Sequence, residues 1–262
     1  MKFLSDFGNV LYNRVRLIIT GLGYNILLLL QTIAQIRYLP KRRKELLLQT
    51  ENSAFGGLPV AMIVGVFTGM VLALQSGIEL ARFKQEANIG MLVAASMCRE
   101  MGPVMTGYIL AGLIGSTIAA ELGTMKVSEE IDALETMSIN PVNFLVLPRI
   151  VAMALVCPLL TIYTDLIGII GGAFIGNVIL NVNMSVYFRN AVDALTVKDV
   201  YSGLCKAVVF GVTIAVVGCA QGLRAEGGAS GVGKATMRAV VVSFIAILIF
   251  DYLLTWLFYW SL

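Results

Sequence analysis

The 262-residue chain contains no histidine, and only 13% of its residues are charged. The lack of histidine excludes a Ser–His catalytic triad, histidine-ligated metals and imidazole acid–base chemistry. A soluble domain carries about 25% charged and 45–50% apolar residues, whereas this chain is 58% hydrophobic. The composition therefore excludes a soluble globular enzyme, a disordered protein and a disulfide-rich secreted domain, and it predicts an all-α polytopic membrane protein.

Cysteine is also scarce, and its spacing carries no metal or redox signal. The cysteines lie in or beside apolar runs without Cys-x-x-Cys spacing, at Cys98, Cys157, Cys205 and Cys219. We interpret them as small core residues, and we predict no metal site and no catalytic residue. Residues 1–15 hold scattered charges without the apolar run of a cleavable signal, so insertion is expected to rely on internal spans.

What the chain does contain is a series of nearly uncharged runs long enough to cross a bilayer, which takes about 20 apolar residues. The five clearest runs are 52–78, 101–120, 150–180, 207–223 and 239–262. They predict five transmembrane helices in one domain over residues 51–262.

Residues 1–50 are expected to form a separate N-terminal segment with one ambiguous apolar run, 17–36. This run lies between Arg14 and Arg16 on one side and the basic residues of 37–44 on the other. Because cytoplasmic segments are rich in Lys and Arg, both ends are expected in the cytoplasm. The run is therefore interpreted as an interfacial or re-entrant helix, with a sixth span as the alternative. The resulting orientation places loops 121–149 and 224–238 inside the cell and loops 79–88 and 181–199 outside.

Two adjacent charges, Arg99 and Glu100, interrupt an apolar run just before Gly102 and Pro103, which weaken or kink a helix. Ionised groups at membrane depth usually face a cavity, a partner or water, because burying them in lipid is costly. The alternative is that both residues mark the outer interface, and the sequence leaves the two interpretations open. Lys206 is expected at a similar depth, in a position to neutralise Glu100.

Asp165 and Asp251 are the only charges inside the third and fifth runs. Together with Arg99 and Glu100 they are the groups that an ion-coupled secondary transporter would use, which is the main alternative function. Hydrogen bonding to a neighbouring helix, or a place near an interface, is the other explanation. Neither acid has an obvious basic partner in the sequence, so they give little support to a pump.

The loop after the second span contains a short amphipathic helix with Ser128 as its expected N-cap. Ile131, Leu134 and Met137 share its apolar face, and Asn140-Pro141 is expected to end it. Such a helix is either an inert connector or a ligand for a groove on a partner protein. Its carboxylates would be repelled by anionic lipid, which favours the protein partner.

Glycine is abundant, with 26 residues, and several glycines recur at helical spacing. These are Gly65 and Gly69, Gly112 and Gly115, and Gly168, Gly171, Gly172 and Gly176. Small residues let helix backbones approach closely in lipid. The glycines are expected to pack spans of one chain together, with a homodimer seam as the alternative for some of them.

Residues 228–235 nearly spell the phosphate-binding P-loop but lack its chemistry. Ala235 stands where the Ser or Thr that holds Mg²⁺ belongs, and Thr236 is one place late. A P-loop also follows a strand of a soluble sheet, whereas apolar runs flank this segment. We therefore predict a flexible cytoplasmic turn and no ATP binding by this chain.

The most specific motifs lie in and after the second span. They read Arg-Glu-Met-Gly-Pro-Val at 99–104, Ala-Gly-Leu-Ile-Gly-Ser-Thr-Ile-Ala-Ala-Glu-Leu-Gly-Thr-Met at 111–125, Glu-Glu-Ile-Asp-Ala-Leu-Glu at 129–135 and Asn-Pro at 140–141. With these motifs the chain resembles, over nearly its whole length, the MlaE/YrbE permease family, the membrane subunits of MCE-associated ABC transporters. It departs from the family pattern at Glu130, where a glutamine is common, and at Leu113, where many members have an arginine.

The resemblance implies a homodimeric permease with an N-terminal interfacial helix, five spans and a cytoplasmic coupling helix between spans 2 and 3. It implies no enzymatic activity in this chain, because a separate cytoplasmic ABC ATPase would bind and hydrolyse ATP. It further implies that phospholipid, the bound substrate, moves between the bacterial inner membrane and a periplasmic MCE-domain protein, in support of outer-membrane lipid asymmetry. No cofactor of its own and no nucleic acid are expected.

The resemblance also assigns site residues. The lipid-binding cavity would have Leu72, Leu80 and Phe83 as apolar wall and Arg99, Glu100 and Lys206 as charged groups. Arg99 or Lys206 would attract the lipid phosphate. The ATPase-coupling helix would comprise Glu129, Glu130, Ile131, Asp132, Leu134 and Glu135. Closure of the ATPase would push on Ile131 and Leu134.

Overall fold

The computed structural model describes the backbone of residues 2–260 and the side chains of residue 16 and residues 19–260. Within residues 2–260 the chain is helical throughout apart from short connections, and it contains no strand. This confirms the all-α class expected from the composition.

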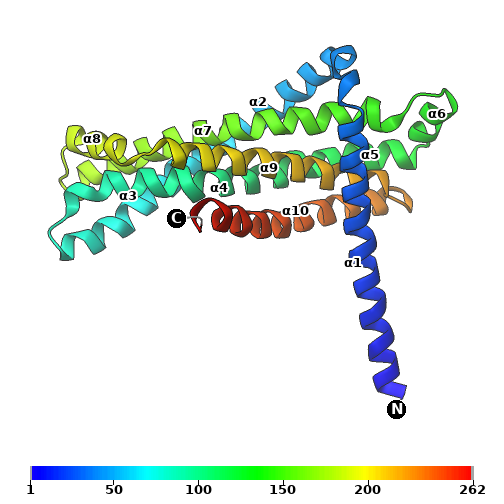
Figure 1. Ribbon diagram of the computed structural model, residues 1–262, viewed down its shortest axis with the longest axis horizontal. Helices are drawn as coiled ribbons and strands as arrows, with labels where there is room; N and C mark the ends of the chain where they lie inside the picture. Colours follow the sequence, from blue (N-terminus) through cyan, green and yellow to red (C-terminus); the bar gives the residue numbers. More distant parts are fainter. Residues whose placement is uncertain (1, 261–262) are drawn as a thin grey trace.

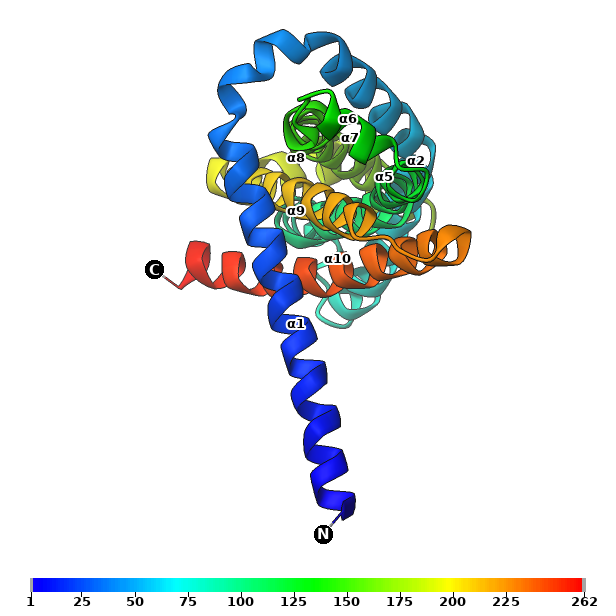
Figure 2. The same cartoon turned by 90° about the vertical axis from the view of Figure 1, so that its right-hand side faces the viewer.

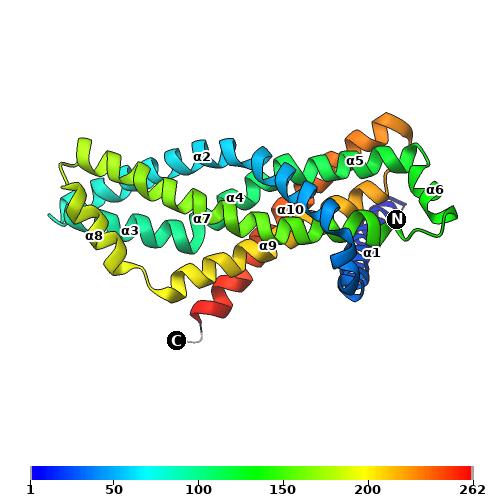
Figure 3. The ribbon, with the colours of Figure 1, turned by 90° about the horizontal axis from the view of Figure 1, so that it is seen from above.

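Five long apolar helical stretches form the bundle, and the last of them crosses the long axis of the molecule obliquely (Figure 1, Figure 2, Figure 3). They are Ile36–Arg82, Glu86–Val127, Val142–Val178, Val197–Leu223 and Gly228–Tyr259. Each is long and apolar enough to cross a bilayer. The five expected spans are therefore confirmed, and the second begins earlier than the uncharged run that predicted it.

The spans are built from several helical segments. The first comprises η1 (Ile36–Arg42) and α2 (Arg43–Arg82), and the second comprises η2 (Glu86–Asn88), α3 (Ile89–Ser96), η3 (Met97–Met101), α4 (Gly102–Leu110), η4 (Ala111–Gly115) and α5 (Ser116–Val127). The third comprises η5 (Val142–Val146) and α7 (Leu147–Val178), and the last two are α9 (Val197–Leu223) and α10 (Gly228–Tyr259). η3, η4 and η5 are wide π-helical turns, a form that is frequent at functional sites.

The first helix, α1 (Lys2–Ala34), runs across the spans near one end of the bundle and projects beyond it (Figure 1, Figure 2). The apolar stretch of α1 whose side chains the structure describes is Ile19–Ala34. Leu28 is buried in what we call the main core cluster, which also contains Leu122, Ile150 and Phe210. Arg224, directly after α9, lies over the Tyr24 ring at 5.3 Å. This crossing is the orientation expected of an interfacial helix. α2 is continuous past residue 50, so the expected segment boundary falls inside a helix.

Glycines bring α2 and α7 into backbone contact. A Cβ on Gly69 would overlap the backbone of Gly168, and a Cβ on Gly65 would stand 3.0 Å from the Thr164 carbonyl oxygen. A Cβ on Gly171 would stand 2.7 Å from the carbonyl oxygen of Val66. At these positions the glycines therefore pack two spans of one chain together, as expected for helices in lipid.

The connection between the third and fourth spans was expected to be a loop, but it contains a helix, α8 (Met184–Ala194). Asn183 caps it by accepting a hydrogen bond from the Ser185 amide at 2.9 Å. Tyr187 is buried in what we call the outer core cluster, which also contains Ile89, Val93 and Met97. The Asn190 side-chain amide donates to the Ala87 carbonyl at 2.7 Å. α8 therefore covers the end of the bundle opposite α6 (Glu130–Thr136) (Figure 1).

Candidate functional site

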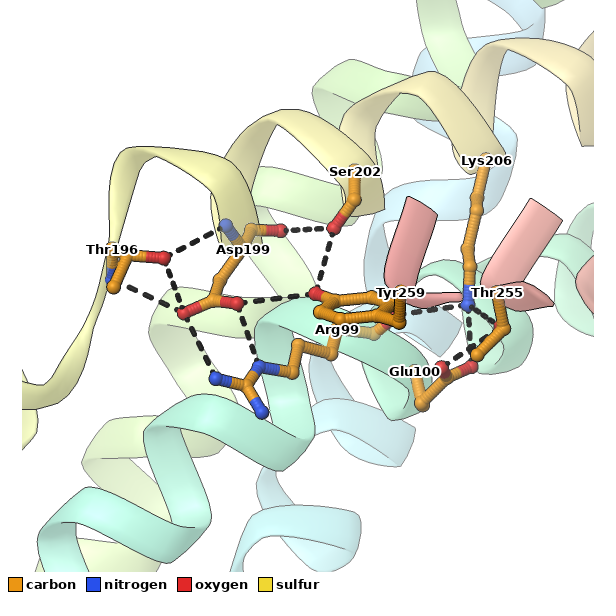
Figure 4. Close-up of polar contacts among 8 residues, drawn as sticks. All are labelled: Arg99, Glu100, Thr196, Asp199, Ser202, Lys206, Thr255 and Tyr259. Carbon is orange, nitrogen blue, oxygen red and sulfur yellow. Dashed lines mark hydrogen bonds and ion pairs between the residues drawn. The ribbon is translucent and has the colours of Figure 1, made fainter. Parts of the chain in front are cut away.

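The second, fourth and fifth spans meet around one buried ammonium group (Figure 4). The Lys206 side chain is 0% exposed, and its Nζ lies 2.6 Å from Glu100 Oε2 and 2.9 Å from Asp251 Oδ1. The same Nζ donates to Thr255 Oγ1 at 2.7 Å, and Thr255 in turn donates to Glu100 Oε1 at 3.0 Å. A charge at this depth is stable only when opposite charges and hydrogen bonds surround it, and Lys206 has both.

The position of Lys206 follows from the proline in the second span. Pro103 has no amide hydrogen, so it cannot donate to the carbonyl four residues earlier, that of Arg99. Lys206 Nζ donates to this carbonyl oxygen at 3.1 Å. The lysine therefore satisfies a backbone acceptor that the proline leaves open, next to the π-helical turn η3.

A second ion pair lies nearer the α8 end, at the start of α9. Arg99 Nε donates to Asp199 Oδ1 at 2.7 Å and Nη2 donates to Oδ2 at 3.2 Å, which is a bidentate pair. The Thr196 hydroxyl donates to Asp199 Oδ2 at 2.8 Å within a capping box that begins α9. The Tyr259 hydroxyl donates to Asp199 Oδ1 at 3.1 Å and lies 3.1 Å from the Ser202 hydroxyl. Asp199 is thus fixed from three elements.

Together these contacts form what we call the charged network, which comprises Arg99, Glu100, Asp199, Lys206, Asp251, Thr255 and Tyr259. Two cations face three carboxylates in it. Lys206 is fully enclosed by acceptors, so it is not free to attract a lipid phosphate, contrary to the expectation from the sequence. Arg99 is 42% exposed, so its guanidinium remains accessible beside its carboxylate partner.

The structure shows what the adjacent charges contact. Arg99 and Glu100 lie within the helical stretch Glu86–Val127 and pair with charged residues of the fourth and fifth spans. The expected neutralisation of Glu100 by Lys206 is confirmed.

Of the two isolated acids, Asp251 has Lys206 as its basic partner, which corrects the expectation that it had none. Asp165 lies against Gly102 at the end of the π-helical turn, where a side chain on residue 102 would overlap it. Asp165 Oδ1 is buried and has no hydrogen-bond partner among the side chains that the structure describes.

Three members of the network, Asp199, Thr255 and Tyr259, were not predicted. A signal for Asp199 existed, because Thr-x-x-Asp before an apolar run is a capping-box pattern. No sequence signal pointed to Thr255 or Tyr259, because a hydroxyl residue near the end of an apolar span is typical of the membrane interface.

The expected apolar wall is only partly assembled. Leu72 and Leu80 are half-buried and pack, together with Met101, on the outer core cluster that contains Met97 and Tyr187. Met101 belongs to the same π-helical turn as Arg99 and Glu100, so apolar and charged surfaces meet at η3. Phe83 ends α2 and is 74% exposed, so it does not join the two leucines.

The short helix in the cytoplasmic loop is α6, and its start differs from the expectation. Glu129, with φ of 61°, is its N-cap residue, whereas Ser128 ends α5 and its hydroxyl donates to the Thr124 carbonyl at 2.9 Å. α6 ends at Thr136, before Asn140-Pro141. The Asn140 side chain instead accepts from the Val142 amide at 2.9 Å, at the start of the third span.

The two faces of α6 have different partners. Ile131 is buried in the main core cluster and Leu134 packs against it, so both apolar residues face the chain's own bundle. The carboxylate residues are exposed at Glu129, Glu130, Asp132 and Glu135. Lys126 Nζ lies 2.7 Å from Asp132 Oδ1 and ties α5 to α6. An incoming partner therefore meets the acidic side of α6, and not Ile131 directly.

This combination of five spans and charges held at membrane depth defines a multi-pass α-helical membrane protein. Residues 46–257 match the family described as Permease MlaE, and the chain belongs to this family. It is therefore an ABC transporter permease, a membrane transport component that acts with an ATPase partner.

Relatives from distant organisms agree with this assignment. The chain is 46% identical to a probable ABC transporter permease protein of Rickettsia typhi, over 77% of this chain and 78% of that protein. It is 38% identical to a probable ABC transporter permease protein of Synechocystis, over 77% of each chain. It is also 35% identical to the chloroplastic protein Trigalactosyldiacylglycerol 1 of Arabidopsis thaliana, over 80% of this chain and 60% of that protein.

Proposed function

We propose that this chain is the permease subunit of an ABC transporter that moves phospholipids between the bacterial inner membrane and a periplasmic MCE-domain protein, in support of outer-membrane lipid asymmetry. A diacylglycerol-based lipid as substrate is supported by the Arabidopsis relative, whose name is that of a glycerolipid. The permease acts as a homodimer, with phospholipid as its bound substrate and no cofactor of its own.

One observation carries this proposal, the meeting of charged and apolar surfaces at the π-helical turn η3. Arg99 offers a partly exposed guanidinium there, while Met101, Leu72 and Leu80 present apolar surface from the same region. A phospholipid has the same two parts, an anionic headgroup and apolar chains. Burial of the chains contributes about 0.8 kcal/mol per CH₂ whatever the headgroup, so headgroup selectivity should be low.

The homodimer is supported by the apolar surfaces that the spans leave uncovered. Only 11% of the most apolar part of α10 is buried, against 67% for α9. Leu248 and Ile249 of α10 are more than half exposed. These surfaces can face either lipid or a second copy, and a cavity between two copies would place both networks around one substrate.

ATP hydrolysis belongs to the partner in this scheme. The P-loop-like segment at 228–235 forms the first turns of α10 and follows α9, so no strand precedes it. The flexible turn predicted for this segment is wrong, because it is helical, and a helix stands where the strand before a P-loop would be. The energy must then reach the permease mechanically, through a surface that the ATPase contacts.

We assign this coupling to α6. The exposed carboxylates of α6 offer the contact surface, and Ile131 connects the helix to core residues of the second and third spans, such as Leu122 and Ile150. Movement of the ATPase would act on the acidic face of α6 and pass through Ile131 to the spans. Arg99 and its neighbours would then change their exposure to the lipid.

The experiment is transfer of a fluorescent phospholipid by the complete complex in proteoliposomes. We expect transfer to require ATP and the ATPase subunit, and Arg99→Gln and Leu80→Asn to slow it. Ile63→Asn, in the same helix but 59% exposed and outside the cluster that holds Leu80, is the matched control and should have little effect.

Three outcomes would overturn the proposal. Transfer without ATPase that follows a pH or sodium gradient would identify an ion-coupled transporter. Normal transfer by both Arg99→Gln and Leu80→Asn would remove η3 from the lipid path, and a complex that assembles without transporting any lipid would identify a membrane scaffold.

A further inference from the structure

A polar cavity lies at the α6 end of the bundle, away from the charged network. Its volume is about 710 Å³, within the range of pockets that bind small ligands. η1 forms one wall, in the blue arc between α1 and α2, and the connection from α6 to η5 forms the other (Figure 2). The polar lining comes from Arg37, Tyr38, Lys41, Arg42, Asn140 and Asn143.

The aromatic ring of Tyr38 gathers two of these cations. The Arg37 guanidinium stands 4.9 Å from the ring centroid and also donates to the Tyr38 hydroxyl at 3.1 Å. Lys41 Nζ stands 5.9 Å from the same centroid. Cation–π attraction thus holds two positive groups near each other without cancelling their charge.

The third cation is already engaged. Arg42 lies 3.7 Å from Glu45, donates to Asn143 Oδ1 at 3.4 Å and stacks over Phe144 at 4.6 Å. Neither Arg37 nor Lys41 forms an ion pair with a carboxylate among the described side chains. The cavity therefore presents two unneutralised cations, and an anion is the complementary ligand.

The surroundings point to an anion that belongs to a lipid. η1 joins α1, which crosses the bundle end, to the start of the first span. Its basic residues lead us to expect the cavity at the cytoplasmic membrane surface. Exposed apolar side chains lie close to the lining residues in the sequence. Ile36, between the lining residues Gln35 and Arg37, is 55% exposed, and Leu47 and Leu48 of α2 are 68% and 56% exposed. A phospholipid has an anionic headgroup followed by apolar acyl chains, so cations with exposed apolar side chains nearby are complementary to it.

We infer that this cavity binds the phosphate of an anionic phospholipid from the cytoplasmic leaflet, with Arg37 and Lys41 as its principal contacts. The amides of Asn140 and Asn143 supply further hydrogen bonds to the headgroup. The Asn140 side chain also accepts a hydrogen bond from the Val142 amide, at the start of the third span. A bound lipid would therefore link η1 to the segment that follows α6. The site is separate from the charged network and does not depend on which lipid is transported.

The test is titration of the full chain, purified in neutral detergent, with phosphatidylglycerol, measured by native mass spectrometry. Neutral detergent removes the general attraction to an anionic bilayer, so direct contacts decide the result. We expect Arg37→Gln with Lys41→Gln to weaken binding about tenfold or more. The matched control, Arg43→Gln with Lys44→Gln, removes the same charge from neighbouring residues outside the cavity lining and should weaken it less than about threefold. Arg37→Lys with Lys41→Arg keeps both charges and should largely retain binding, which separates the effect from misfolding.

Each other outcome contradicts the inference. Equal losses in the cavity pair and the control pair would show diffuse surface electrostatics. Inorganic phosphate that competes with phosphatidylglycerol at equal concentration would identify a free-phosphate site. Unchanged lipid binding together with lost ATPase association in the cavity pair would identify an acidic protein surface as the occupant.

Discussion

At the scale of single residues, the protein surrounds a fully buried lysine of the fourth span with acceptors from two other spans, the second and the fifth. Lys206 has Glu100 on one side, Asp251 on another and the Arg99 carbonyl oxygen on a third. The last contact exists because Pro103 cannot donate to that carbonyl. Lys206 is therefore a structural link between spans, and Arg99 is the cation left partly open to a ligand.

Replacing this lysine should destabilise the protein strongly. Lys206→Met leaves the carboxylates of Glu100 and Asp251 without their cation, and breaking a buried ion pair costs about 3–5 kcal/mol. Because Glu100 and Asp251 are 33% and 22% exposed, we expect a loss near the lower end of that range. The melting temperature of the detergent-purified chain measures the effect.

The rescue variant is Lys206→Met combined with Glu100→Gln and Asp251→Asn, which removes the uncompensated charges and should recover much of the loss. A single Lys206→Met variant that melts like the wild type would show that the ion pairs do not stabilise the bundle.

At the scale of elements, α2 and α7 are held together by backbone contact rather than by large side chains. Gly69 and Gly168 touch at a point where even a methyl group does not fit. The same residue type elsewhere has no such role, since no atom lies within 4 Å of a Cβ placed on Gly112. The helical spacing of glycines alone did not distinguish these two cases.

A pair of identical substitutions tests this difference. Gly69→Ala should lower the melting temperature, because the new methyl group pushes α2 away from the α7 backbone. Gly112→Ala should leave it unchanged or raise it slightly, because alanine favours a helix over glycine by about 0.5–1 kcal/mol. Equal melting temperatures for both variants would contradict the backbone contact.

The second element with a clear prediction is α6. Glu130→Lys with Glu135→Lys reverses two exposed charges while leaving the buried Ile131 in place, so the membrane fold should persist. We expect much less ATPase subunit to co-purify with this variant than with the wild type. Glu79→Lys, an exposed charge reversal at the end of α2 away from α6, is the control and should co-purify normally. Normal association of the α6 variant would remove this helix from the ATPase interface.

At the scale of the whole molecule, five spans place α6 and α8 at opposite ends of the bundle (Figure 1). The basic residues of η1 lie at the α6 end, where the positive-inside rule predicts the cytoplasm. The charged network lies toward the other end, between the middle of the bundle and α8. The proposed lipid path and the proposed ATPase contact therefore require movement along the length of the spans.

Cysteine labelling tests this orientation. Cys205→Ser is a suitable background, because the other three cysteines are buried. Ser185→Cys in α8 should react with a membrane-impermeant maleimide in intact spheroplasts, and Thr136→Cys in α6 should react only after permeabilisation. The reverse pattern would invert the topology and place α6 beyond reach of a cytoplasmic ATPase.

The sequence by itself determined the helical class, the number of spans and the absence of histidine-based chemistry. These depend on composition and on the length of apolar runs, which are local properties. It also placed Arg99, Glu100 and Lys206 in one site, partly through a family resemblance and partly because charges inside spans are few. The expected cap at Ser128 was wrong because the local pattern ignored the preceding helix, which extends to Val127.

Only the tertiary structure decided which charges pair and which faces are buried. Thr255 joins Glu100 across 155 residues of sequence and Lys206 across 49, so no local pattern contains these contacts. Ile131 is a second example, because only the structure shows that it is buried in the core of its own chain. Hydrophobic runs determine that a segment enters the membrane, but the pairing of its few polar groups depends on how the spans pack, because each buried charge must find its partner on another helix.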